Sequence, residues 1–206
     1  MSLSPIWVVK LGGSLFAGQY LRPWLDVLAT HGRGCLVIVP GGGPFADQVR
    51  AAQKRWRFDD AMAHRMAMLG MAQYGLMLAG LQSELTPAVD EAEISSALRA
   101  NKIPVWVPDG VRSLEVPRDW SATSDSLAAA LAARLRVKRL VLVKSIRLAA
   151  ERISARELAR QGVIDQTFPR LFTKARYACR VLAATDYATL PAVLHSAATG
   201  GTTLTP

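Results

Sequence analysis

The sequence predicts an α/β protein in which an open, mainly parallel central sheet is covered by helices on both faces, as a three-layer α/β/α sandwich. Short apolar runs of the strand type alternate with helical patterns along the whole chain. The run Cys35–Val39 is apolar at every position, as in a parallel strand that is buried on both faces. Glycines follow two of the predicted strands, and such sheets bind ligands at the carboxyl ends of their strands.

The first half of the chain alternates between apolar runs typical of strands and apolar residues at helical spacing. Pro40 to Pro44 is a turn, and the helix that opens after it carries Phe45, Val49 and Ala52 on one face. The next helix is long, rich in Ala, Met and Leu, and nearly free of charge, which indicates a core position or a subunit interface. The predicted elements are the strands Ile6–Leu11 and Cys35–Val39, and the helices Leu15–Thr30, from Phe45 onward, and Asp59–Leu81.

The second half continues the alternation. We predict the helix Glu91–Asn101, the strand Ile103–Val107, the helix Ser124–Leu135, the strand Lys138–Val143, the helices Ser154–Gln161, Leu171–Ala183 and Tyr187–Ala197, and a last strand Gly201–Thr205. No repeat, low-complexity tract or linker interrupts these patterns. A chain of 206 residues suits one well-buried domain, so we expect a single domain over residues 1–206.

Composition narrows the class of protein. No stretch of about 18 apolar residues lacks a charge, so we expect no membrane span. Met1 leads into the first strand without a basic start or a small-residue cleavage site, so we expect no signal peptide. Cys35 and Cys179 are far apart, and Cys179 lies in a helical pattern; we expect two reduced thiols and a cytoplasmic protein. No Cys and His spacing indicates a protein-held metal.

The formal net charge of +9 suits an anionic partner, either a nucleic acid or a small anion such as a nucleotide. No zinc finger and no aromatic-interleaved platform for single strands accompanies the basic residues. We therefore expect a small-molecule partner rather than a nucleic acid. The basic residues are spread over several groups: Lys54, Arg55 and Arg57; Arg134, Arg136, Lys138 and Arg139; and Arg170, Lys174, Arg176 and Arg180.

The first glycine motif, Val9 to Ser14, joins a strand end to a helix start. Glycine lets backbone N–H groups approach an anion without a Cβ in the way, and a helix N-terminus adds partial positive charge. Lys10 can place an ammonium group on the same phosphate. A tight turn with a surface lysine fits equally well, and both interpretations stay open from this segment alone.

The second motif, Gly41 to Gly43, repeats this device at the next strand end. Three adjacent glycines cost conformational entropy, so a mere connector rarely needs them. A second anion site facing the first suits a reaction between two molecules that carry phosphate or carboxylate. The spacing matches neither a Walker A loop nor a dinucleotide fingerprint.

The third motif, Trp120 to Ala128, opens a helix. Thr123 or Ser124 is placed to cap that helix, and Asp125 lies in its first turn, where the helix dipole favours a carboxylate. The segment fits a capping motif alone, or a functional one in which Asp125 orders lysines around a transferred phosphoryl group.

These three segments together resemble the amino acid kinase superfamily, which includes acetylglutamate kinase, aspartokinase, uridylate kinase and isopentenyl phosphate kinase. The V-K-L-G-G-S motif matches Val9–Ser14, the G-G-G turn matches Gly41–Gly43, and the S-D-S-L-A segment matches Ser124–Ala128. Each motif is weak alone, whereas three in order over most of the chain are fairly specific. The resemblance implies the amino acid kinase fold.

The resemblance also implies an ATP-dependent phosphotransferase that carries Mg²⁺ with its ATP and phosphorylates a small anionic acceptor, a phosphate monoester or a carboxylate. Positioning and charge neutralisation do most of the work in phosphoryl transfer, and an anionic acceptor needs no protein base. The implied catalytic residues are Lys10, Asp125 and Lys174, the last as the family's second phosphate lysine near a helix start. The implied nucleotide contacts are Lys10, Gly12, Gly13, Ser14 and Lys174, and the implied acceptor contacts are Gly41, Gly42 and Gly43.

The sequence departs from the family pattern after the strand that ends at Val143. A Thr-Asp-Val-Asp-Gly-like segment is usual there, whereas this chain has the basic segment Lys144–Leu148. Either Lys144 contacts the nucleotide phosphates directly or the nucleotide binds differently. A catalytically silent nucleotide- or oxyanion-binding protein on the same fold is the alternative that this segment keeps open.

The short form of the chain, with Val-Lys-Ser after that strand and Gly162–Asp165 later, most resembles kinase-like proteins of the methanofuran and tetrahydromethanopterin pathways. These include the aminomethylfuran phosphate kinase group, which makes a diphosphate from a monophosphate. An acceptor of this kind, in C1-carrier cofactor biosynthesis, would suit the basic charge.

Several other residues admit two interpretations. Asp109 and Arg112 follow a strand end and are either acceptor contacts or parts of a solvated turn. Trp106 and Trp120 pack in the core or border the acceptor, and we expect His64 to be structural or exposed. The methionines between residues 62 and 77 indicate core or a dimer interface, so we expect a homo-oligomer.

Overall fold

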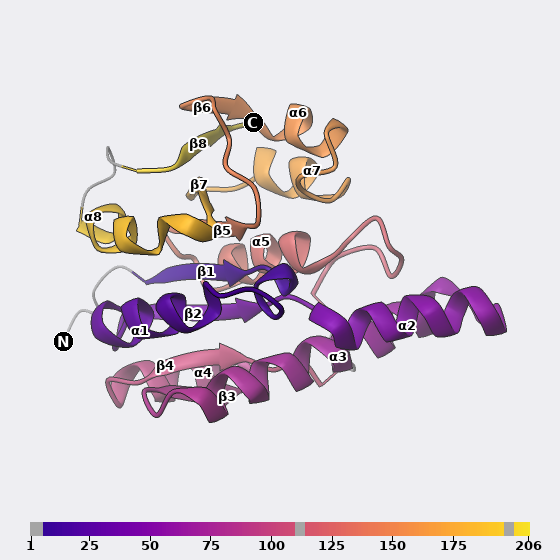
Figure 1. The fold of residues 1–206 in the computed structure, drawn as a ribbon, viewed down its shortest axis with the longest axis horizontal. Coiled ribbons are helices and arrows are strands. Elements are labelled where there is room, and N and C mark those ends of the chain that lie inside the picture. Colours follow the sequence, from indigo (N-terminus) through magenta and orange to yellow (C-terminus); the bar gives the residue numbers. More distant parts are fainter. Residues whose placement is uncertain (1–5, 110–113, 196–199) are drawn as a thin grey trace.

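The computed structural model describes residues 6–109, 114–195 and 200–206. In these residues eight strands form one sheet in the order β3-β4-β2-β1-β5-β7-β8-β6 (Figure 1). All neighbours from β3 to β7 in that order are parallel, β8 is antiparallel to β7, and β6 is parallel to β8. The predicted open, mainly parallel sheet is confirmed.

The elements follow the alternation that the sequence predicts. The strands are β1 Trp7–Leu11, β2 Leu36–Pro40, β3 Leu85–Ala88, β4 Ile103–Trp106, β5 Arg139–Lys144, β6 Arg152–Ser154, β7 Ala178–Ala183 and β8 Thr202–Thr205. The helices are α1 Leu21–His31, α2 Gly43–Trp56, α3 Asp60–Leu81, α4 Glu91–Arg99, α5 Ser124–Arg134, α6 Ala155–Arg160, α7 Phe168–Thr173 and α8 Leu190–His195. Short 3₁₀ segments span Gly13–Leu15 and Ala184–Thr189.

Helices cover both faces of the sheet. Val8 of β1 belongs to an apolar cluster with residues of α4, α5, α6 and α7. Its neighbours Trp7 and Val9 belong to a second cluster with residues of α1, α3 and α8. Alternate side chains of a strand point to opposite faces of the sheet, so these two clusters are the two interfaces of a three-layer sandwich. The predicted fold class is confirmed.

The predicted helix Leu171–Ala183 is wrong. The chain forms the short helix α7 and then the strand β7, in which Cys179 is fully buried as a free thiol. β7 pairs with β5 over six residues and with β8 on its other side. Pairing on both sides of the strand outweighs the helical preference of this alanine-rich segment.

Other boundaries differ from the prediction. The helix predicted from Leu15 begins at Leu21, after a 3₁₀ turn that the first glycines lead into. The short strands β3 and β6 were not predicted, because both are partly polar and neither alternates over more than four residues. The predicted helix Tyr187–Ala197 begins as 3₁₀ structure and becomes α-helical at Leu190. Its last residues, and Arg112, lie outside the described residues.

None of the helices in the described part of the chain is both long enough and apolar enough to cross a bilayer.

Candidate active site

Two lysines lie at the carboxyl ends of adjacent parallel strands. Lys10 is the fourth residue of β1, and Lys144 is the last residue of β5. The register pairs Lys10 with Leu142, so Lys144 lies two residues farther along. Both side chains are largely buried, with exposed fractions of 6% for Lys10 and 13% for Lys144. Burial of a lysine ammonium group is costly unless a counter-charge accompanies it.

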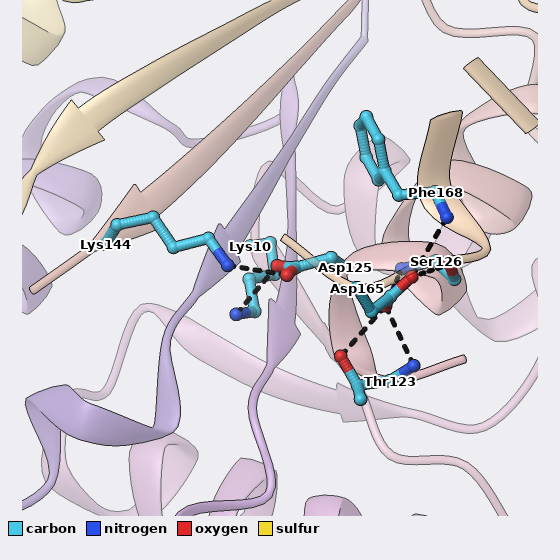
Figure 2. A network of polar contacts seen from close by, with 7 residues as sticks. All are labelled: Lys10, Thr123, Asp125, Ser126, Lys144, Asp165 and Phe168. Carbon is cyan, nitrogen blue, oxygen red and sulfur yellow. Dashed lines mark hydrogen bonds and ion pairs between the residues drawn. The ribbon is translucent and has the colours of Figure 1, made fainter. Parts of the chain in front are cut away.

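Asp125 supplies that counter-charge from the first turn of α5. Its Oδ1 lies 3.0 Å from Nζ of Lys10, and its Oδ2 lies 2.5 Å from Nζ of Lys144 (Figure 2). We call these three residues the lysine–aspartate cluster. Two cations share one carboxylate, so the cluster keeps one excess positive charge in a buried place, which suits an anion such as a phosphoryl group.

The cluster shifts the proton affinities of its members. Burial alone would raise the pKa of Asp125, but the positive charges of Lys10 and Lys144 outweigh it and hold that pKa below its ordinary value. Burial, with the charge of Lys10, lowers the pKa of Lys144 to about 8, and Asp125 and Asp165 oppose this shift. Lys144 is therefore charged at neutral pH and loses its charge a little above it.

Asp165 anchors the helix that carries Asp125. Its Oδ2 accepts hydrogen bonds from the backbone N–H and hydroxyl of Thr123, at 2.8 and 2.9 Å, and from the N–H of Ser126, at 3.0 Å. Its Oδ1 accepts from the hydroxyl of Ser126 and, at 2.9 Å, from the N–H of Phe168. One carboxylate thus joins the starts of α5 and α7 (Figure 2).

The sequence interpretation missed this role of Asp165. Thr123 does occupy the cap position of α5, but its side chain accepts no hydrogen bond from the helix. Its hydroxyl instead donates to Asp165, 42 residues later. A long-range cap leaves no local pattern in the sequence, and the only signal was the place of Asp165 at the end of the Gly162–Asp165 segment.

The two glycine motifs pack directly against each other. The N–H of Gly41 donates to the carbonyl of Leu11 at 2.8 Å. A Cβ on Gly13 would lie 2.4 Å from the backbone N of Gly43, and a Cβ on Gly41 would lie 2.3 Å from the N of Gly13. These positions need glycine because two backbones meet there without room for a side chain. The predicted facing of the two motifs is therefore present.

A cavity of about 230 Å³ opens beside these loops, between α2, α3 and the start of α5. We call it the α2–α3 cavity. Its size suits a small molecule, and it combines apolar walls with a few polar groups. Its lining residues are Gly13, Ser14, Gly42, Gly43, Ala46, Asp47, Arg50, His64, Ala67, Met68, Met71, Trp120, Ala122, Thr123, Ser124 and Leu127.

Arg50, Trp120 and His64 give this cavity its polar and aromatic character. The guanidinium of Arg50 lies 4.4 Å from the ring centre of Trp120 and forms an ion pair with Asp47 at 2.8 Å. Burial lowers the pKa of His64, although the nearby Asp119 opposes this shift. The sequence leaves Trp120 open between core and pocket and predicts His64 to be structural or exposed; both residues line the cavity.

Lys174 does not join the lysine–aspartate cluster. It follows the last residue of α7 instead of opening a helix, and it lies exposed beside Ala132 and Ala133 near the end of α5. The second buried lysine that contacts Asp125, beside Lys10, is Lys144. The geometry therefore does not support Lys174 as the family's second phosphate lysine, because it lies beside the end of α5, whereas Lys144 lies at the end of β5 and contacts Asp125.

Asp109 also lies apart from the glycines. It lines a separate hollow with Asp90, Trp106 and Arg134, and no residue of this hollow lines the α2–α3 cavity. Its predicted contact with the same acceptor as Gly41 to Gly43 is therefore not supported by the geometry.

The described residues offer anion-binding groups rather than a metal cage. Among them, no three His, Cys, Asp or Glu side chains gather as a possible metal site. A polyphosphate fits the excess charge of the lysine–aspartate cluster, and Mg²⁺ is commonly held largely by substrate phosphates and water rather than by a dedicated protein cage. The chain would bind such a nucleotide through Lys10, Lys144 and the backbone of Gly12 and Gly13.

Comparison with known proteins agrees with this geometry. The model of the amino acid kinase family matches residues 5–147. A [5-(aminomethyl)furan-3-yl]methyl phosphate kinase from Methanocaldococcus jannaschii is 26% identical over 177 residues, which are 80% of this chain and 81% of the relative. The family match covers more than half of the chain, so the protein belongs to the amino acid kinase family, and the predicted phosphotransferase class is confirmed.

Solved structures share the fold at low sequence identity. A uridylate kinase from Archaeoglobus fulgidus superposes with a TM-score of 0.73 at 15% identity, over 97% of this chain and 100% of that one. An isopentenyl phosphate kinase from T. acidophilum gives 0.66 at 12% identity, over 97% and 100%. These likenesses establish the amino acid kinase fold.

Proposed function

We propose that this protein transfers the γ-phosphoryl group of ATP to a small phosphate monoester that occupies the α2–α3 cavity. The observation that carries the proposal is Asp125, held between the buried Lys10 and Lys144 beside that cavity. In the transfer, an acceptor phosphate oxygen forms a bond to the γ-phosphorus while the bond to the β–γ bridging oxygen breaks and ADP leaves.

Each group of the chain has a role in this scheme. Lys10 and Lys144 neutralise charge on the transferring group, and Asp125 keeps both ammonium groups aimed at it. Gly12, Gly13 and Ser14 hold the nucleotide phosphates through backbone N–H groups, while Gly42 and Gly43 hold the acceptor. The acceptor oxygen is already an anion, so the reaction requires no protein base.

The cavity supports an acceptor that carries both a phosphate and an aromatic ring. Arg50 and His64 offer donors to a phosphate, Trp120 offers a ring to stack on, and the carboxylate of Asp47 can receive an ammonium group. A furan with an aminomethyl arm and a phosphate, the substrate named for the Methanocaldococcus jannaschii relative, has all three features. We propose this class of acceptor, with a diphosphate as product.

We also propose that the ATP carries Mg²⁺, that the protein is cytoplasmic and that it forms a homo-oligomer. The proposal of a homo-oligomer is based on α3, which exposes four large apolar side chains: Met62, Met66, Leu69 and Leu76. Successive members are three, four or seven residues apart, so they form one apolar stripe along the helix. Light scattering of the purified protein tests it: substitution of Leu69 and Leu76 by Arg is expected to leave a monomer, and an unchanged mass would remove α3 from the interface.

ADP release tests the function. The protein is incubated with ATP and Mg²⁺ and with a panel of phosphate monoesters, among them an aminomethylfuran phosphate, and carboxylates. We expect release that depends on a phosphate monoester and is lost in Lys10→Ala but kept in Lys102→Ala, a surface lysine paired with Glu84. ATP binding without turnover on any acceptor would favour the catalytically silent alternative that the Lys144–Leu148 segment raised.

A further inference from the structure

Basic residues that are spread along the sequence meet on one surface of the folded chain. They come from the end of α5 and the turn after it, from α6, and from α7 and the segment after it. All seven are exposed, and they are seven of the 25 lysines and arginines of the chain. We call them the basic surface: Arg136, Lys138, Arg156, Arg160, Arg170, Lys174 and Arg176.

Two neighbouring hollows make up this surface. One, of about 560 Å³, lies between α6 and α7 and is lined by Arg156, Arg160, Arg170 and Lys174 among others. The other, of about 590 Å³, is lined by Arg136, Lys138, Lys174 and Arg176 among others. Lys174 belongs to both, so the hollows adjoin, and no Asp or Glu is among the lining residues of either.

The charges of this surface are left almost without partners. Arg160 forms an ion pair with Glu157 one turn earlier on α6. The other six form no ion pair with any described residue. Like charges that gather without counter-charges repel one another and contribute nothing to the stability of the fold. An external polyanion would remove that cost.

The basic surface is separate from the proposed kinase site. Lys138 directly precedes β5 and Arg176 shortly precedes β7, whereas Lys10 and Lys144 lie at or near the carboxyl ends of their strands. No residue of either hollow lines the α2–α3 cavity. An occupant of the basic surface therefore does not compete with substrate.

We propose that the basic surface binds the phosphate backbone of a double-stranded nucleic acid, independently of sequence. Two adjoining hollows suit a row of phosphates better than a single compact anion. Single-strand binders stack bases on aromatic side chains, but the aromatic residue that lines these hollows, Tyr177, is buried with its hydroxyl donating to the carbonyl of Ala129 at 3.1 Å. The surface offers charge to phosphates and no ring to bases.

Fluorescence anisotropy with a labelled duplex of 20 base pairs tests the proposal. Binding is measured for the full chain between 50 and 200 mM salt. Because about seven cations release counterions, affinity is expected to fall on the order of 10³-fold over that range. The test variant is Arg170→Glu with Lys174→Glu. The matched control is Lys54→Glu with Arg55→Glu on α2, which changes the net charge equally.

The two variants separate a site from general attraction. We expect at least tenfold weaker duplex binding in the test variant and much less loss in the control. A second pair, Lys138→Glu with Arg176→Glu, gives the same result if the first pair does not fold. Equal losses in test and control variants, or no duplex binding at 100 mM salt, would overturn the proposal. Displacement of the duplex by poly-glutamate at equal charge concentration would also overturn it, because the ligand would then be an acidic protein. Displacement by ATP at equal charge concentration would overturn it as well, because the ligand would then be a small anion.

Discussion

The lysine–aspartate cluster and the basic surface use the same charged residue types in opposite ways. In the cluster, Lys10 and Lys144 are buried and share the carboxylate of Asp125. On the basic surface, seven cations are exposed and only Arg160 has a partner in the described structure. Burial fixes the cluster in one geometry at a desolvation cost. The exposed charges of the basic surface keep their hydration, so they pay little desolvation cost and are screened by salt.

This difference shows why residue type alone does not reveal a role. A lysine that must stabilise a transferring phosphoryl group needs a fixed position and a low dielectric environment. A lysine that attracts a polyanion needs only charge and access. Lys144 and Lys174 look alike in the sequence, and the fold assigns one to each region.

The largest expected effect follows from removal of the shared carboxylate. Asp125→Ala leaves two buried ammonium groups without a counter-charge, which costs roughly 3–5 kcal/mol of folding free energy. It also frees both lysines to move, so kcat is expected to fall about 10³-fold. Urea denaturation and ADP release measure the two effects. The control is Asp59→Ala, which removes the exposed cap of α3; an equal loss of kcat there would contradict the special role of Asp125.

Salt is expected to affect the basic surface and the lysine–aspartate cluster differently. Between 50 and 200 mM salt, duplex affinity is expected to fall on the order of 10³-fold, whereas kcat with saturating ATP and acceptor is expected to change less than about twofold. Stopped assays of ADP release at each salt concentration, beside the anisotropy series, check this. A kcat as sensitive to salt as duplex binding would mean that the cluster is not shielded as its burial indicates.

A smaller effect is expected from Asp165, which acts through Asp125. Asp165→Asn keeps the shape but turns an amide toward groups that donate hydrogen bonds, so the start of α5 loosens. We expect kcat to fall about 10- to 100-fold with little change in the KM of the acceptor. We also expect the alkaline loss of activity to move to lower pH, because the negative charge of Asp165 raises the pKa of Lys144. Asp90→Asn, at the cap of α4, should do neither. A lower melting temperature with an unchanged pH profile would make Asp165 merely structural.

The glycine contact is expected to affect stability more than chemistry. Gly41→Ala places a Cβ 2.3 Å from the backbone N of Gly13, so the two loops must separate, and the cost is expected to be roughly 1–3 kcal/mol. Gly80→Ala is the matched control, because nothing lies within 4 Å of a Cβ there, and it is expected to stabilise α3 by about 0.5–1 kcal/mol. Thermal melting followed by circular dichroism compares them; equal melting temperatures would show that the loops are not in contact.

Much of this fold and part of its site could be predicted from the sequence. Continuous apolar runs identified the central strands, because these strands are buried on both faces, and apolar composition and helical spacing identified the long helices. Three short motifs located Lys10, both glycine loops and Asp125. The sequence could not show that residues 178–183 pair as a strand, since the partners β5 and β8 lie far along the chain.

The remaining errors have a common cause. The cap that Asp165 provides and the contact between Lys144 and Asp125 join residues 42 and 19 positions apart, and no local pattern records such contacts. The resemblance implies Lys174 as the second phosphate lysine and leaves Lys144 as a possible phosphate contact, whereas the fold places Lys144 beside Asp125 and Lys174 on the basic surface. Local chemistry is visible in a sequence; which charges become neighbours is decided by the fold.

The pH dependence of kcat tests the central claim, that the buried cluster carries the transfer. The pKa of Lys144 is lowered from 10.5 to about 8, so the charged form is lost as pH rises through 8. Between about 8 and 10.5 the unfolded chain binds more protons at this residue than the folded chain, so its contribution to stability rises with pH and unfolding does not explain a loss of rate. We predict that kcat of the wild type falls near pH 8, and that Lys144→Arg, which stays charged, loses that fall even if its rate at pH 7 is lower. The same alkaline fall in both proteins would contradict the account.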